Sequence, residues 1–156
     1  MAEYTANAVQ VVNPGETVVF TESPIPCDRG FVRHRDGSGN FLLSGWTPNR
    51  QRACRCFRNK SANYLVEFGA NISIPAGGTV EPISVAITVD GSTIPASTMT
   101  VTPAADEEYF NVSRAINADI WNGCCETVAV RNTSAQPIQI QNANIIFTRP
   151  DLAVTY

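Results

Sequence analysis

Residues 64–74 read Tyr-Leu-Val-Glu-Phe-Gly-Ala-Asn-Ile-Ser-Ile, with an apolar residue at every even position. Glu67, Asn71 and Ser73 lie at odd positions between them. Successive side chains of a β-strand point to opposite faces, so this period of two predicts a strand with one buried face. Pro75 and the two glycines that follow it closely end the strand.

The same alternation recurs in both directions along the chain. Ile and Val occupy every odd position of residues 83–89, and Asp90-Gly91 follows, a pair suited to the positive φ angles of a tight hairpin. Near the C-terminus the apolar positions change from even to odd between Asn142 and Ala143, which predicts a β-bulge. We also expect strands at residues 9–12, 17–20, 31–34, 41–43, 99–101 and 110–116, and helical turns only at 104–108 and 115–121.

About nine short strands without a long helical pattern predict an all-β fold, a two-sheet antiparallel sandwich. The composition agrees, because 15 Val and 12 Ile against four Leu favour a pleated sheet over a helix. A length of 156 residues predicts a single domain over residues 1–156. The apolar runs are far too short to cross a bilayer and the first residues show no secretory signal, so we expect no membrane partner.

Charged residues make up only 16% of the chain, and 13 Asn, 14 Thr and 10 Ser outnumber them. Hydroxyl and amide groups are less costly to desolvate than ammonium groups, so such a surface suits association with protein or with sugar. An equally good explanation is a sandwich whose solvent faces are rich in Thr.

The basic residues are concentrated in one part of the chain. Between Arg29 and Lys60 lie eight of the eleven basic residues and a single acid, Asp36. Part of this stretch, residues 45–62, reads as an Arg/Cys-rich loop or insertion, and long loops of this kind often make interfaces. Candidates for docking on an acidic partner surface are Arg50, Arg52, Arg55, Arg58 and Lys60. Pairing with acids of the same subunit is an alternative; nucleic acid is disfavoured by the pI near 5.1.

We expect no catalytic residues, no cofactor and no metal. His34 is the only histidine, and no Gly-x-Ser-x-Gly motif accompanies it. Glu107 and Glu108 are adjacent and would point apart on an extended segment, so a glycan-cleaving enzyme would need carboxylates from distant strands. The five cysteines favour reduced or partly paired thiols, with two alternatives, a zinc site or a bridge from Cys27 to Cys124 or Cys125.

Three further side chains have two interpretations each. Trp46 and Trp121 could stack on a sugar ring, although burial at the end of a sheet is the commoner role of tryptophan. Arg114 interrupts the apolar positions Phe110, Val112 and Ile116, which indicates an arginine that is either paired within its own subunit or placed at a subunit seam.

Several segments resemble a family of small virion structural proteins from phages and prophages of gut Firmicutes, which are jelly rolls of the tumour-necrosis-factor type. The segments are residues 1–10, 68–75, 83–91, 100–105 and 141–149, together with Gly123-Cys124-Cys125. A looser similarity, in the hairpin and in a terminal strand ending in Arg, extends to the globular heads of spore-surface collagen-like proteins. Residues 45–62 have no counterpart in this pattern.

The resemblance implies a homotrimeric jelly roll that decorates a capsid or forms a head fibre. It would be assembled in the bacterial cytoplasm, and its partners would be itself and the major capsid protein or another virion protein. The alternative function is a knob that binds a receptor or a host-surface glycan.

A trimer of this architecture should bury strands with apolar residues on both faces, as residues 18–20 and 145–147 have. The predicted trimer seam therefore contains Val18, Phe20, Arg114, Ile145 and Phe147.

Overall fold

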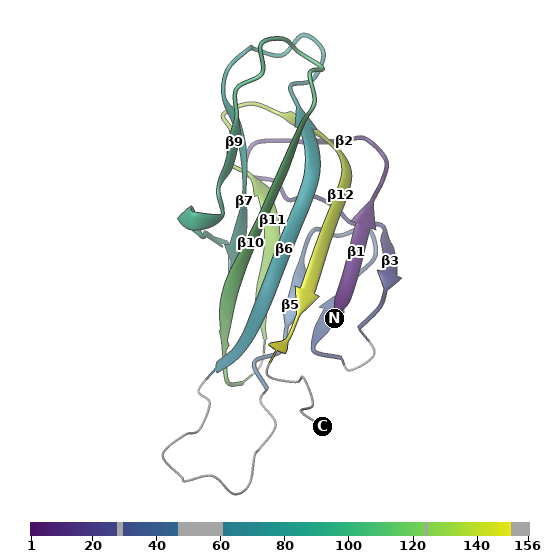
Figure 1. Cartoon of the computed structure of the whole chain (residues 1–156), viewed down its shortest axis with the longest axis vertical. Helices are drawn as coiled ribbons and strands as arrows, with labels where there is room; N and C mark the ends of the chain where they lie inside the picture. Colours follow the sequence, from purple (N-terminus) through teal and green to yellow (C-terminus); the bar gives the residue numbers. More distant parts are fainter. Residues whose placement is uncertain (28–29, 47–60, 124, 151–156) are drawn as a thin grey trace, which may run out of the picture.

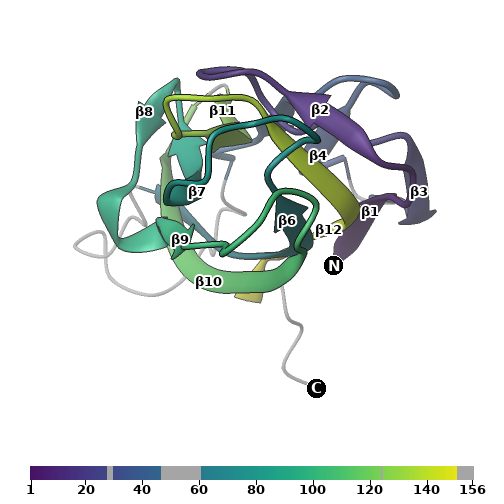
Figure 2. The ribbon, with the colours of Figure 1, turned by 90° about the horizontal axis from the view of Figure 1, so that it is seen from above.

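Two six-stranded antiparallel sheets face each other across one hydrophobic core in the computed structural model, which describes residues 1–27, 30–46, 61–123 and 125–150 (Figures 1 and 2). No α-helix occurs in these ranges, and the one helical element is the 3₁₀ turn η1 (Pro95–Ser97). The predicted all-β, two-sheet antiparallel jelly roll is confirmed.

Sheet 1 contains the long strands and lies toward the viewer in Figure 1. Its spatial order is β10 (Phe110–Trp121), β6 (Ser61–Ser73), β12 (Ile138–Thr148), β1 (Ala2–Ala6) and β3 (Glu22–Ile25), with β2 (Gln10–Val12) also paired with β12. The N-terminal and C-terminal strands are therefore neighbours at the centre of one sheet.

Sheet 2 is built from shorter strands. Its order is β4 (Val32–His34), β5 (Phe41–Leu43), β11 (Glu126–Asn132), β7 (Ile83–Val89) and β8 (Ser92–Thr93), with β9 (Met99–Val101) also paired with β7. Strand β7 has the bounds that the alternation predicts. The hairpin after it turns through Asp90 at φ 46° and Gly91 at φ 78°, as the residue pair predicts.

The even positions of β6 are buried from Ala62 to Ile72, so the strand that decides the fold lies where its sequence places it. In β12 the register shifts between Gln141 and Asn144, and Asn142 adopts φ 52°, which confirms the predicted β-bulge. The bulge is needed because it keeps the apolar positions on the core side both before and after residue 142.

Four side chains of the predicted trimer seam belong instead to the core of the single subunit. Val18, Phe20, Ile145 and Phe147 are all 0% exposed within one chain, so the prediction that they form a seam is wrong. Residues 17–20 form bridges to Arg131 and Ser38 on the sheet 2 side, which turns Val18 and Phe20 inward. In β12 the bulge sends residues 145 and 147 inward and leaves Ile146 half-buried on the other face.

The predicted helical turns are also absent. Residues 115–121 continue strand β10, which pairs with β6 over its whole length, and residues 104–108 form turns without a helix. Cross-strand pairing outweighs the weak helical pattern of the short segment. Among the described residues, no helix has the length and apolar character needed to cross a membrane.

Candidate functional site

The face of sheet 1 that points away from the core, here called the outer face, is the most extended candidate surface. Its middle carries small or apolar residues, because Leu65 and Gly69 of β6, Ala115 of β10 and Ile146 of β12 all point outward. Leu65 and Ile146 are half-buried and Ala115 is exposed. The same alternation that builds the core thus leaves an outer face without basic residues at its outward positions, on which Glu3, Glu67 and Asp119 are the charged groups.

Amide side chains surround this middle and are hydrogen-bonded to neighbouring polar side chains. Asn111 donates from Nδ2 to Oδ1 of Asn71 at 3.2 Å, and the Tyr109 hydroxyl donates to Oε1 of Gln139 at 3.2 Å. On the β1 side, Nδ2 of Asn144 donates to Oε1 of Glu3. Side chains that already satisfy one another can be covered by a partner at a lower desolvation cost than free charges.

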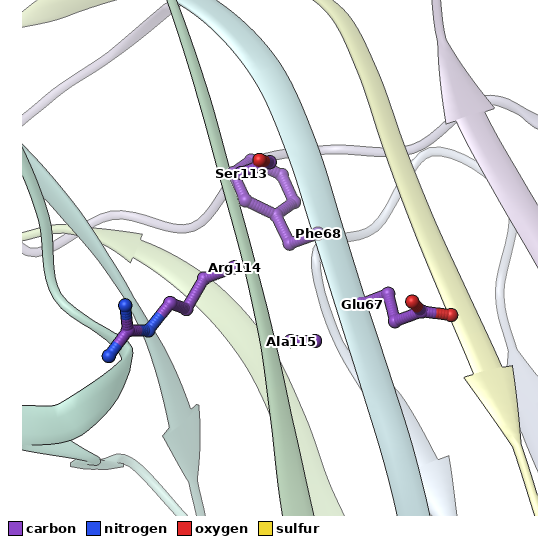
Figure 3. A pocket seen from close by; sticks show the side chains of 5 residues that line it. All are labelled: Glu67, Phe68, Ser113, Arg114 and Ala115. Atoms are coloured by element: carbon purple, nitrogen blue, oxygen red, sulfur yellow. The ribbon is translucent and has the colours of Figure 1, made fainter.

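A hollow of about 350 Å³ opens along the pairing of β10 with β6. Its lining residues are Glu67, Phe68, Ser113, Arg114 and Ala115 (Figure 3). Ser113 lies opposite Gly69 and Ala115 opposite Glu67 in the strand register. The small side chains of Ser113 and Ala115, and the absence of a side chain at Gly69, leave this hollow open.

The two charged residues of the hollow point in opposite directions. Figure 3 shows Glu67 directed toward β12 and Arg114 directed away from β6, toward η1. Arg114 is exposed, and its Nε donates to the carbonyl oxygen of Ala96 at 2.9 Å. The partner of Arg114 within the subunit is therefore a backbone carbonyl group. The place of Arg114 at a subunit seam stays a prediction.

Both tryptophans are exposed at one end of the sandwich. Trp46 is 59% and Trp121 67% exposed, so the expectation that they are buried at a sheet end is wrong. Gly45 lies directly against the Trp121 backbone, where a Cβ atom on Gly45 would be 1.7 Å from the Trp121 carbonyl oxygen. Two segments that are distant in sequence thus bring the two tryptophans to the same end.

Polar side chains accompany Trp121 on the outer face. Asp119 is two residues before Trp121 in β10, and its Oδ1 accepts a hydrogen bond of 2.7 Å from Nδ2 of Asn63 on β6. An exposed ring beside a fixed carboxylate and amide pair can bind a sugar by stacking and by hydrogen bonds to hydroxyls.

Arg149 is a buried cation near this end that the sequence arguments did not single out. It is 4% exposed, its guanidinium lies 5.3 Å from the centroid of the Tyr64 ring, and Nη2 donates to the carbonyl oxygen of Trp46. The Tyr64 hydroxyl donates to the carbonyl oxygen of Ser44 at 2.6 Å. The only sequence signal was the terminal strand ending in Arg. These contacts fix the segment that carries Trp46.

His34 has a packing role in the described structure. Its ring stacks on Phe41 with centroids 4.4 Å apart, and Nε2 donates to the carbonyl oxygen of Ser38 at 3.0 Å. Its Nδ1 lies 3.9 Å from a carboxylate oxygen of Asp36. Within the described ranges, no group of three His, Cys, Asp or Glu side chains could hold a metal ion.

Cys27 is free and half-buried, whereas Cys125 is disulfide-bonded. The alternative of a bridge from Cys27 to Cys124 or Cys125 is therefore wrong, and the Cys27 sulfur instead accepts a hydrogen bond from the Val32 amide at 3.4 Å.

The five candidate docking residues lie outside the described ranges, so the structure does not test them. They are Arg50, Arg52, Arg55, Arg58 and Lys60.

No family model and no curated protein matches this chain. Among solved structures, it is similar to the globular domain of zebrafish complement 1qA protein, at 8% identity over 93% of this chain and 94% of that chain, with a TM-score of 0.50. Rabbit GITRL aligns at 9% identity over 99% and 100% of the two chains, with a TM-score of 0.44. The C-terminal domain of the sugar-binding protein EclA aligns at 14% identity over 90% and 79%, with a TM-score of 0.41.

Identities this low show the fold alone. The similarity to the complement domain supports a jelly roll like that of the complement 1qA globular domain, which agrees with the sequence-based expectation of a jelly roll.

Proposed function

We propose that this chain is a non-enzymatic structural protein that assembles as a homotrimer through the outer face of sheet 1. The observation that carries the proposal is the chemistry of that face. Its middle carries Leu65, Gly69, Ala115 and Ile146 beside Glu67, Asn111 is bonded to Asn71, and no Lys or Arg side chain lies at the outward positions of its described strands. An interface between subunits is typically depleted of charge in this way.

The place of this trimer is a phage particle, where it decorates the capsid or forms a head fibre. This part rests on the resemblance of the sequence to virion structural proteins. Its partners are two further copies of the chain and the major capsid protein or another virion protein, and it is assembled in the cytoplasm of the bacterial host. The Arg-rich residues 50–60 dock it to the particle through their forked donors.

The test is imaging of intact particles labelled with an antibody to this chain. We expect label at regular positions on the particle surface. A variant with Arg52, Arg55 and Arg58 all changed to Glu should assemble normally and leave particles unlabelled. Particles without label from the unmodified chain would overturn the virion role, and label retained by the variant would overturn only the docking residues.

A second candidate function is glycan binding at the end of the sandwich, favoured by one observation. Trp121 is 67% exposed beside the bonded Asp119 and Asn63 pair, so a sugar ring can stack there while its hydroxyls bind the polar pair. Binding to a glycan array should be lost in Trp121→Ala and Asp119→Ala and kept in Asn117→Ala, a change on the same strand face. No binding by the unmodified chain would reject this function.

A further inference from the structure

We propose that Arg114 of one subunit forms an ion pair with Glu67 of the neighbouring subunit. This inference rests on the trimer proposed above and names the charged contact that orients one copy against the next.

Arg114 is the only basic residue in the described strands of sheet 1. Among the described residues, no carboxylate lies within ion-pair distance of it. Its Nε bond to the Ala96 carbonyl holds the exposed side chain at the edge of sheet 1 formed by β10, directed toward η1. A positioned, exposed guanidinium can bind a carboxylate through two parallel hydrogen bonds.

Glu67 differs from the other acids of sheet 1 in its contacts. The other three acids of the described strands accept hydrogen bonds within the subunit, Glu3 from Asn144, Glu22 from Thr5 and Asn7, and Asp119 from Asn63. For Glu67 no hydrogen bond or ion pair occurs within the described residues, although its side chain is exposed in the middle of the outer face. A carboxylate covered by a neighbouring subunit needs a donor from that subunit.

The two side chains point to opposite sides, which is the arrangement that a ring of subunits requires. In a ring, one patch of each subunit meets a different patch of the next, so complementary charges have to lie on opposite sides of one copy. Glu67 is directed toward β12 and Arg114 toward η1 (Figure 3). A two-fold dimer, by contrast, would bring one patch against itself.

The two residues also lie at the same height along the sheet. Glu67 is paired with Ala115 in the register, and Arg114 is the next residue along β10, so the offset is one strand residue, about 3.3 Å. Rotation about an axis parallel to the strands leaves height unchanged. The Arg114 side chain of one copy therefore reaches the level of Glu67 on its neighbour.

The hollow between them provides room for this contact. It has a volume of about 350 Å³ and is lined by Glu67, Phe68, Ser113, Arg114 and Ala115, and the small side chains of Ser113 and Ala115 leave space for an incoming guanidinium beside Glu67.

The experiment is reversal of the charge at each residue. Sedimentation measures the subunit concentration at which half of the trimer has dissociated. Arg114→Glu and Glu67→Arg should each raise this concentration about tenfold or more, because each places like charges at every seam. The double variant should return it to near the unmodified value. Arg33→Glu and Glu81→Arg make the same charge changes away from sheet 1 and should leave it unchanged.

A mixture of the two single variants gives a second readout. In a ring of three built from both variants, the two seams that join unlike copies bring opposite charges together. The third seam always joins two copies of the same variant and therefore keeps like charges in contact. Mixing should restore assembly only in part, whereas an even-numbered ring would be restored fully.

The outcomes separate this inference from the proposed function. An unmodified chain that stays monomeric overturns the trimer and the ion pair together. A trimer whose midpoint is unmoved by both single variants, or not restored by the double variant, overturns the ion pair and leaves the trimer standing. Far-ultraviolet circular dichroism verifies that each variant is folded.

Discussion

Gly45 is the residue at which the absence of a side chain matters most. A Cβ atom there would lie 1.7 Å from the Trp121 carbonyl oxygen, which is backbone and can move only with β10. We expect Gly45→Ala to lower the free energy of unfolding by about 2 kcal/mol or more, measured by urea denaturation. Gly69→Ala is the control, because its Cβ would meet ordinary contacts of 3.8 Å or longer. Equal stabilities of the two variants would refute the close approach.

We expect the free energy of unfolding to fall with rising pH in the alkaline range because of Tyr4. Burial raises the pKa of Tyr4 above its usual value of 10.0, and the neighbouring charges of Cys27 and Asp36 raise it further. The folded state therefore holds this proton more tightly than the unfolded state. The resulting stabilisation is complete below about pH 10 and is lost as the pH rises toward the folded pKa.

The measurement is urea denaturation between about pH 8 and about pH 11. The unmodified chain should lose stability more steeply at the alkaline end than Tyr4→Phe, which has no proton to release. Identical pH profiles would show that Tyr4 titrates alike in both states.

Single side chains were predictable from the sequence only where a pattern constrained them. The bulge at Asn142 was predicted because the apolar positions change parity there. The exposure of Trp121 was not predictable, because it depends on where β10 ends relative to the second sheet. The same holds for Glu67, which the sequence shows only as one polar residue in an alternating strand.

Asn132, the last residue of β11, connects the end of β2 with the loop between β11 and β12. It is fully buried, its Nδ2 donates to the carbonyl oxygens of Val12 and Gln136, and its Oδ1 accepts from the Ser134 amide. Asn132→Ala would leave three backbone groups without partners, so we expect a loss of about 3 kcal/mol in the free energy of unfolding. Thermal and urea denaturation measure it, with the exposed Asn117→Ala as the control; a loss no greater than the control's would contradict this role.

At the scale of elements, alternation was sufficient for strands β6 and β7 and insufficient for two short strands. Strands β6 and β7 were predicted because apolar residues occupy alternate positions in each. Strands β1 and β3 were missed, since β1 has only five residues and all four residues of β3 are exposed. The helical turn expected at 115–121 was wrong because pairing with β6 continues through it.

The seam prediction failed for a reason that also belongs to this scale. An apolar run such as residues 145–147 was interpreted as a strand covered on both faces. The bulge and the core bury Ile145 and Phe147, so only Ile146 remains for a partner. A sequence pattern indicates that a residue is apolar, but it does not distinguish burial in the subunit core from burial in an interface between subunits.

The whole molecule has one surface whose chemistry differs from that of an ordinary solvent-facing sheet. The outer face of sheet 1 combines the small or apolar residues Leu65, Gly69, Ala115 and Ile146 with amides that are hydrogen-bonded to neighbouring polar side chains. It also carries Glu67, while Arg114 lies at the same height at the β10 edge of the sheet, directed toward η1, and neither has an ion-pair partner in the part of the chain that the structure describes. A symmetric ring of copies accounts for all of these features together.

The mass of the unmodified chain in solution at micromolar concentration tests this account most directly. Light scattering or sedimentation should give three times the 16.9 kDa of one chain. A stable mass of 16.9 kDa over the same concentrations would contradict the account, because the outer face of sheet 1 would then be a solvent-exposed surface.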